Sequence, residues 1–223
     1  MKKVAFLCSG GGGNLKFLNR CVQEGLLKSH HLAGVVADRE CGALQFAVQN
    51  KIPAYQVDYS QGRNSALQER LDDLDAQIIV TNIHKILDGE TVRRYSGKLI
   101  NLHYSLLPAF KGMIGEKPVR MAFDQGCKFT GATVHRVNEE VDGGEILSQA
   151  VMPLEPQFPF EQTMDKVFKL GCLLLLNSLE LLEKGMGHPR GPFKIDPVAG
   201  HFFNPPLLFD ERLFTERFWS KIK

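Results

Sequence analysis

Apolar residues form short continuous runs in the first half of the chain, and the segments between the runs carry apolar residues three or four positions apart. The runs predict buried strands, and the wider spacing predicts amphipathic helices. The strands are expected at residues 3–9, 31–38, 53–58, 76–82 and 98–103, and the helices at 14–27, 41–50, 65–74 and 88–95. Buried strands that alternate with helices predict an α/β fold, with a Rossmann-like parallel sheet flanked by helices.

The pattern changes after residue 110. A helix is expected at residues 116–125, and two strands at 128–137 and 146–154. The strands are joined by "NEEVDGGE", a polar connection typical of a hairpin with a long loop. Residues 160–184 predict a long, leucine-rich helix. The expected fold is therefore α/β, with a mostly parallel sheet followed by a β-hairpin, a long helix and an aromatic tail.

The tail, residues 186–223, differs in composition from the rest of the chain. Residues 186–223 contain the stretch "GHFFNPPLLFDERLFTERFW", which has too many large apolar groups for a disordered segment. These groups must pack on the parent domain, on a second subunit or on a substrate. We expect a catalytic domain at residues 1–185 and an extension at 186–223 that forms part of an acceptor site or a dimer contact.

Charge and cysteine content narrow the class of protein. The 223 residues include 27 basic and 25 acidic side chains, and no block of one sign stands out, so neither nucleic acid nor a membrane is expected as a partner. The five cysteines are odd in number and lack a C-x-x-C pair, which predicts reduced thiols in a cytoplasmic protein. No spacing typical of metal ligands supports a metal site.

Four glycines follow the first predicted strand in "SGGGGNL". Glycine lets backbone N–H groups turn toward an anion at a helix N-terminus, which predicts contact with a phosphate-bearing ligand. Asn14 is the expected N-cap of the following helix. The loop fits neither G-x-G-x-x-G nor a P-loop. Asp38 at the end of the second strand suits a ribose hydroxyl, so a nicotinamide-dependent oxidoreductase stays open as an alternative.

Asn101 and His103 close the strand at 98–103 in "LINLHYSLLPAF". Side chains alternate along a strand, so both point to the same face, and ligands bind at the carboxyl ends of parallel strands. An amide donor beside a histidine suits a carbonyl that becomes an oxyanion. Asp142, in "VDGG", is a candidate to orient the histidine. The competing interpretations are that Asn101 and His103 merely end the strand, and that Asp142 forms an Asx turn.

Three motifs together resemble a known family. "INLHYSLLPAFKG" is similar to an N-x-H-x-S-L-L-P run, and "GATVHRVNEEVDGGEIL" is similar to a T/S-V-H strand followed by a D-G-G turn. These features are typical of the folate-dependent formyltransferase family. The loop "SGGGGNL" resembles the S-G-x-G-S-N-L loop of the glycinamide ribonucleotide transformylase branch. The resemblance covers roughly residues 3–184.

The resemblance implies an activity and a set of site residues. A primary amine would attack the formyl carbon of 10-formyltetrahydrofolate, the co-substrate. Asn101 and His103 would stabilise the oxyanion, and Asp142 would raise the pKa of the histidine. The implied folate contacts are Arg63, His84, Lys85, Ile86, Leu87, Asn138, Glu139, Glu140 and Val141. The implied contacts to a phosphorylated amine are Gly11, Gly12, Gly13, Asn14 and Tyr104.

The chain departs from the family pattern on the acceptor side. Gly13 stands in place of a serine, Tyr104 in place of a proline, and Phe168 and Gly171 in place of a glutamine and a glutamate. These departures favour a nucleotide-linked amino sugar as acceptor. Phosphoribosylglycinamide of purine synthesis is the alternative acceptor. A non-catalytic folate- or nucleotide-binding module also stays open, as does a homodimer.

Overall fold

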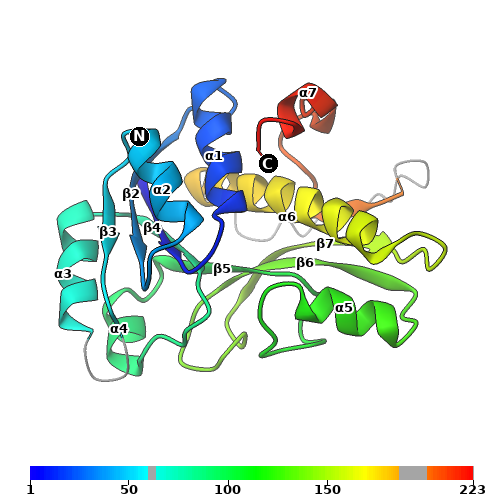
Figure 1. The fold of residues 1–223 in the computed structure, drawn as a ribbon, viewed down its shortest axis with the longest axis horizontal. Helices are drawn as coiled ribbons and strands as arrows, with labels where there is room; N and C mark the ends of the chain where they lie inside the picture. The colour runs from blue at the N-terminus through cyan, green and yellow to red at the C-terminus, as the bar shows by residue number, and fades with distance from the viewer. Residues whose placement is uncertain (60–63, 186–199, 223) are drawn as a thin grey trace. The chain divides into compact units, whose positions relative to one another are not determined.

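Eight strands form the sheet of the computed structural model, which describes residues 1–59, 64–185 and 200–222 (Figure 1). The strands are β1 (Lys2–Cys8), β2 (His30–Ala37), β3 (Ala54–Gln56), β4 (Ile78–Asn82), β5 (Leu99–His103), β6 (Phe129–Arg136), β7 (Ile146–Pro153) and β8 (Phe202–Asn204). Their order in the sheet is β3-β2-β1-β4-β5-β6-β7-β8. The helices are α1 (Gly13–Gln23), α2 (Gly42–Gln49), α3 (Ser65–Leu74), α4 (Gly89–Arg94), α5 (Lys117–Asp124), α6 (Phe160–Glu183) and α7 (Glu216–Trp219), with a 3₁₀ turn η1 at Glu211–Leu213.

The parallel part of the sheet has the predicted doubly wound architecture. β1 pairs in parallel with β2 and β4, and β4 pairs in parallel with β5. The chain moves outward from β1 to β3 and then back across β1 to β4 and β5. Right-handed crossovers in opposite directions place α1 and α2 on one face and α3 and α4 on the other (Figure 1). The predicted α/β class with a mostly parallel sheet is confirmed.

The predicted hairpin is also present, and a third strand extends it. β6 and β7 pair antiparallel, and a β-bulge interrupts their register between Val134 and His135. β8 pairs antiparallel with β7. The sequence pattern missed β8 because the strand is only three residues long and α6 separates it from its partner.

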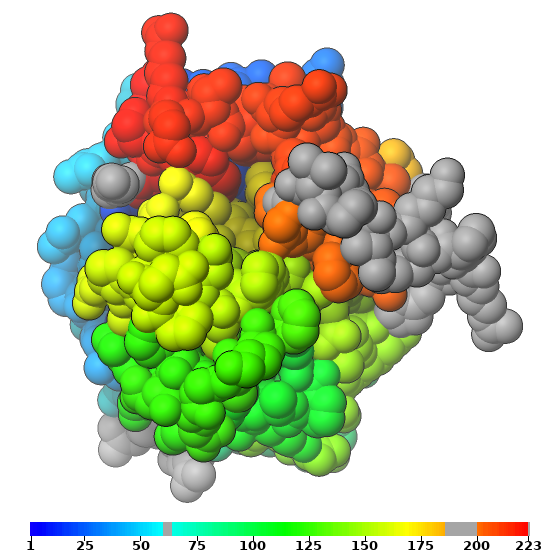
Figure 2. Space-filling model, turned by 90° about the vertical axis from the view of Figure 1, so that its right-hand side faces the viewer, coloured from blue at the N-terminus to red at the C-terminus, as the bar shows by residue number. Residues whose placement is uncertain are grey.

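The long helix α6 buries its leucine side chains. Leu174, Leu175 and Leu179 are fully buried. The side-chain amide of the buried Asn177 donates to the Pro206 carbonyl at 3.1 Å and accepts from the Leu208 N–H at 2.8 Å, so α6 also holds the chain after β8. Figure 2 shows α5 (green) beside the beginning of α6 (yellow).

Contacts divide the chain into two compact units. The first contains Met1–Asn101, Val137–Glu139 and Phe214–Lys223, and the second contains Leu102–Arg136 and Glu140–Leu213. The described part of the tail therefore contributes to both units. The expected division at residues 185 and 186 stays a prediction, and residues 186–199 lie outside the described residues.

The end of the tail packs on α1 within the first unit. The Phe17 ring, fully buried on α1, stacks on Trp219 with a centroid distance of 5.4 Å and lies 5.7 Å from Phe214. Phe218 meets Phe17 edge-on at 5.8 Å. This aromatic cluster accounts for the large apolar side chains at the end of the sequence. A role of the tail in acceptor binding or dimer formation stays a prediction.

We expect Trp219→Ala to lower the free energy of unfolding by about 3–5 kcal/mol, because the substitution leaves a cavity against Phe17. Chemical denaturation followed by circular dichroism measures the change. Leu213→Ala is the matched control in the same segment, since Leu213 is 53% exposed. Equal effects of the two substitutions would show that the tail does not stabilise the first unit.

Among the described residues, no helix is long and apolar enough to cross a membrane. The five cysteines are present as free thiols, as the sequence predicts.

Candidate active site

The glycine loop connects β1 to α1 and packs against the beginning of α2. Gly12 has φ 72°, and a Cβ there would lie 2.8 Å from the Ala43 Cβ, so both conformation and packing require glycine. A Cβ on Gly10 or Gly11 would meet nothing within 4 Å. Packing around these two positions therefore does not explain glycine, whereas close approach of a ligand to the backbone would.

The prediction that Asn14 caps α1 is wrong. Gly12 is the N-cap, in the left-handed conformation, and Asn14 lies inside the first turn with 3% exposure. The helix begins earlier than expected because glycine reaches this conformation without the steric cost that other residues have. Gly11, Gly12, Gly13 and Asn14 remain the predicted contacts for an acceptor phosphate.

Asp38 does not present its carboxylate to a ligand. Its side chain is fully buried and accepts a hydrogen bond from the Arg39 guanidinium at 2.6 Å. The Lys85 ammonium lies 3.6 Å from the same carboxylate oxygen. A carboxylate held by two cations does not suit a ribose hydroxyl, so the observation behind the oxidoreductase alternative does not hold in the structure.

The segment predicted to contact the pterin combines anchored and exposed residues. The backbone N–H of His84 donates to the Ser9 hydroxyl at 3.1 Å, and the Lys85 Nζ lies 3.4 Å from the Asp58 Oδ1. Leu87 packs against the hydrophobic core, whereas Ile86 is 71% exposed. Ile86 is therefore open to a ligand. Arg63 lies outside the described residues.

The predicted contacts after β6 are also at the surface. Asn138, Glu139, Glu140 and Val141 are all exposed. Glu139 accepts a hydrogen bond from Arg93 in the first unit, and Glu140 accepts one from Lys111 in the second. Their role in folate binding stays a prediction.

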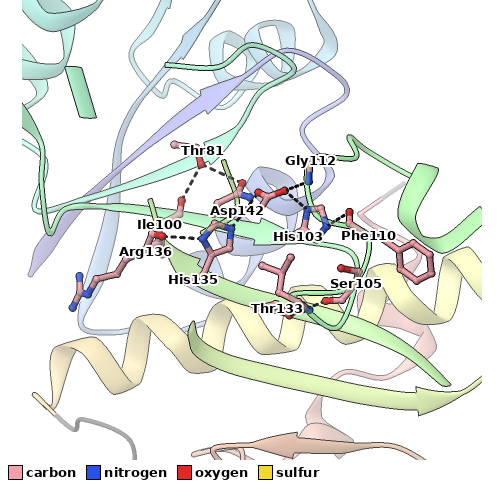
Figure 3. A network of polar contacts seen from close by, with 12 residues as sticks. Thr81, Ile100, His103, Ser105, Phe110, Gly112, Thr133, His135, Arg136 and Asp142 are labelled. Atoms are coloured by element: carbon pink, nitrogen blue, oxygen red, sulfur yellow. Dashed lines mark hydrogen bonds and ion pairs between the residues drawn. The ribbon is translucent and has the colours of Figure 1, made fainter. Parts of the chain in front are cut away.

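Asn101 and His103 lie two residues apart on β5, as expected. The Thr81 hydroxyl is 3.2 Å from both the Asn101 Oδ1 and the Ile100 carbonyl (Figure 3). The Thr81 hydroxyl therefore meets the oxygen end of the Asn101 amide, and the NH₂ group is the end that can donate.

His103 and Asp142 are brought together within the second unit. The His103 Nδ1 lies 3.4 Å from the Asp142 Oδ2, and its Nε2 lies 3.3 Å from the Phe110 carbonyl. The Gly112 N–H donates to the same Asp142 oxygen at 2.8 Å. Asp142 has φ 51°, a conformation that aspartate tolerates better than most residues. The sequence hypothesis that Asp142 faces the histidine agrees with this geometry.

Burial and charge act on His103 in opposite directions. His103 is 5% exposed, and burial lowers its pKa below the usual range, although the Asp142 carboxylate opposes the shift. Burial tends to raise the pKa of Asp142. Hydrogen bonds from His135 and Gly112, with the nearby His103, outweigh burial and hold this pKa below its usual range. The site therefore contains an ionised carboxylate beside a histidine that loses its proton readily.

The loop after His103 is tied to the hairpin by Thr133. The Thr133 hydroxyl donates to the Ser105 carbonyl at 2.7 Å and accepts from the Leu107 N–H at 3.1 Å. The Ser105 hydroxyl donates to the Ala109 carbonyl at 2.5 Å. These bonds fix the loop that carries the Phe110 carbonyl to His103. They give the Ser105 hydroxyl a structural role after the strand end.

Sequence reasoning missed His135 as a member of the site. Its Nε2 lies 3.5 Å from the Asp142 Oδ1, and Figure 3 shows the rings of His103 and His135 both directed at Asp142. The signal available in the sequence was the alternation of Thr133 and His135 along β6, which places both on one face. Among the described residues, no group of three or more histidine, cysteine, aspartate or glutamate side chains is arranged so that it could hold a metal ion.

Tyr104 and Gly171 are coupled by packing. A Cβ on Gly171 in α6 would lie 2.8 Å from the Tyr104 Cε1 and 3.3 Å from the Leu102 Cδ2. The two departures from the family pattern therefore belong together, since the absence of a side chain at Gly171 makes room for the Tyr104 ring.

We expect Gly171→Ala to be stabilising only when Tyr104 is also shortened. Alanine is favoured over glycine in a helix by about 1 kcal/mol, but overpacking against the ring costs about 1–3 kcal/mol. A double-mutant cycle with Tyr104→Ala, followed by thermal unfolding, measures the coupling. Additive effects in the cycle would show that the two positions do not constrain each other.

The buried His103 beside the Asp142 carboxylate is an arrangement typical of enzymes that move a proton. Residues 2–179 match the formyl transferase family, and the chain belongs to this family. It is 34% identical over 169 residues to a phosphoribosylglycinamide formyltransferase of Haemophilus influenzae, covering 73% of this chain and 78% of that protein.

Solved structures show the same fold. A glycinamide ribonucleotide transformylase of Symbiobacterium toebii has a TM-score of 0.76 and 27% identity, covering 83% of this chain and 89% of that one. A formyltetrahydrofolate deformylase of Pseudomonas putida has a TM-score of 0.72 and 26% identity, covering 82% and 66%. The chain spans only 18%, 61% and 55% of three other curated relatives that it matches.

Proposed function

We propose that the protein transfers the formyl group of 10-formyltetrahydrofolate to a primary amine, and that the amine belongs to phosphoribosylglycinamide. The observation that carries the proposal is the buried His103 between the Asp142 carboxylate and the Phe110 carbonyl, on the same strand as Asn101. Such a group of residues suits attack on a carbonyl followed by transfer of a proton.

The reaction needs one bond to form, one to break and one proton to move. The amine nitrogen bonds to the formyl carbon, the bond from that carbon to the folate nitrogen breaks, and a proton passes from the amine to the leaving nitrogen. Asn101 donates to the carbonyl oxygen while it carries negative charge. His103 is neutral when it receives the proton, because burial lowers its pKa, and Asp142 stabilises the imidazolium that forms.

The comparisons favour the purine-type acceptor over the nucleotide-linked amino sugar expected from the sequence. The Haemophilus influenzae relative and the Symbiobacterium toebii structure are both named for the glycinamide ribotide. Phe168 and Gly171 differ from the glutamine and glutamate of the family pattern. We infer that this chain holds the acceptor mainly through its phosphate, at the glycine loop, since Gly10 and Gly11 leave open space there.

The formyl donor is supported by the family and by the deformylase structure, whose name includes formyltetrahydrofolate. Within the segment expected to contact the pterin, Ile86 is exposed and Lys85 is held by Asp58. Folate contact at this segment, a possible homodimer and a cytoplasmic location stay predictions.

We expect formyl transfer to phosphoribosylglycinamide with a kcat/KM at least tenfold above that for nucleotide-linked 4-amino sugars. The assay follows the release of tetrahydrofolate spectroscopically for a panel of amines at equal concentration. Glycinamide without the ribose phosphate is the matched control, because it offers the same amine with no phosphate for the loop. A preference for an amino sugar would instead make Tyr104 and Gly171 part of a changed acceptor specificity.

A further inference from the structure

Two histidines share one carboxylate in the second unit, and the proposed mechanism uses only one of them. The His135 ring is 2% exposed, and His135 pairs with Ile146 of β7, next to the β-bulge whose extra residue, Leu147, lies in β7. The ring meets two oxygens, the Asp142 Oδ1 at 3.5 Å and the Arg136 carbonyl at 2.8 Å.

Hydrogen-bond chemistry defines which protons the His135 ring carries. A backbone carbonyl only accepts, so the Nδ1 that faces Arg136 must carry a hydrogen. An ionised carboxylate also only accepts, so a hydrogen bond from the Nε2, which lies 3.5 Å from the Asp142 Oδ1, needs a second hydrogen on the ring. A ring that donates from both nitrogens is an imidazolium.

We propose that His135 is a positioning residue, a buried imidazolium that pairs with Asp142, neutralises it and directs its second oxygen toward His103. This inference rests on the proposed function. His135 holds a proton next to the reaction centre, and this proton does not take part in the formyl transfer.

The arrangement explains how His103 can be neutral beside a carboxylate. If Asp142 were unpaired, its negative charge would keep His103 protonated. A protonated His103 cannot accept a proton as a base. With His135 paired to Asp142, the two charges cancel, and the buried cluster carries no net charge while His103 is neutral. The groups that act on the pKa of His103 are burial, Asp142, the Phe110 carbonyl and His135, and the His135 charge lowers that pKa.

The direct test is NMR of the free protein labelled with ¹⁵N-histidine, with His135 assigned by its absence in His135→Gln. We expect proton-bound resonances for both ring nitrogens of His135 at pH 7. A neutral ring with one bare nitrogen overturns the proposal. Because no substrate is present, this result does not depend on whether the proposed acceptor is right.

The second test separates positioning from mere packing. Glutamine keeps an N–H donor for Asp142 but no charge, and His135→Phe removes both. We expect the acid limb of kcat/KM to move to higher pH by about one unit in both variants, since Asp142 is then uncompensated. Activity at the pH optimum should be retained better by glutamine than by phenylalanine.

His31→Gln is the matched control. His31 is a partly exposed histidine on β2, and its substitution leaves the acid limb of kcat/KM unchanged. An acid limb that does not move, or moves to lower pH, in His135→Gln overturns the positioning role. Failure of the parent enzyme to transfer a formyl group overturns the proposed function instead, and the NMR measurement then decides the state of His135 by itself.

Discussion

His103→Ala is expected to lower kcat by about 10³–10⁴-fold, the largest effect of any single substitution in this protein. Alanine removes the group that receives the proton of the attacking amine, and nothing else among the described residues near Asp142 offers an acceptor at the same place. The effect should fall mainly on kcat, because His103 acts on the transition state more than on the bound substrates. Single-turnover kinetics with saturating donor and acceptor measures it.

His31→Ala is the matched control for His103→Ala, since it removes a histidine from β2 without touching the site. Thermal unfolding of both variants checks that the fold is retained. A His103→Ala enzyme that keeps more than a tenth of the parent kcat would contradict the assigned mechanism.

Asp142→Asn is expected to lower kcat by about 10²-fold or more and to move the acid limb of its pH profile to lower pH. The sign follows from the charges. The carboxylate favours protonated His103, and its loss lets burial lower the pKa of His103 further. A lower pH is then needed to protonate His103, so the acid limb lies at lower pH. The direction is opposite to that expected for His135→Gln.

Glu145→Gln is the control for Asp142→Asn. Glu145 is in the same hairpin connection, but its exposed carboxylate pairs with Arg136 and does not face His103. Its pH profile should match that of the parent enzyme. A limb that moves to higher pH in Asp142→Asn would show that Asp142 does not favour the charged form of His103.

Much of this fold could be predicted because local rules decide it. Continuous apolar runs mark the buried parallel strands, and alternation along β5 places Asn101 and His103 on one face. Asp142 was a candidate from its place in the D-G-G turn, and the family resemblance supported it. Its contact with His103 depends on how the connection after β6 returns to the site, which no local pattern encodes.

The missed features depend on contacts distant in sequence. His135 meets Asp142 because the chain after β6 folds back toward the end of that strand, and the residue pattern along β6 does not encode this return. Tyr104 and Gly171 are coupled although 67 positions apart, because α6 packs beside the end of β5 within the second unit. The cap of α1 was misplaced because a glycine in the left-handed conformation replaced the expected side-chain cap.

The measurement that tests the central claim most directly follows the formyl carbon itself. The enzyme is mixed with 10-formyltetrahydrofolate that carries ¹³C in the formyl group and with phosphoribosylglycinamide, and ¹³C NMR records the product. We expect a formamide resonance that appears at the rate of tetrahydrofolate release and disappears with His103→Ala. Free formate as the product, at a rate independent of the amine, would contradict transfer and show hydrolysis of the donor instead.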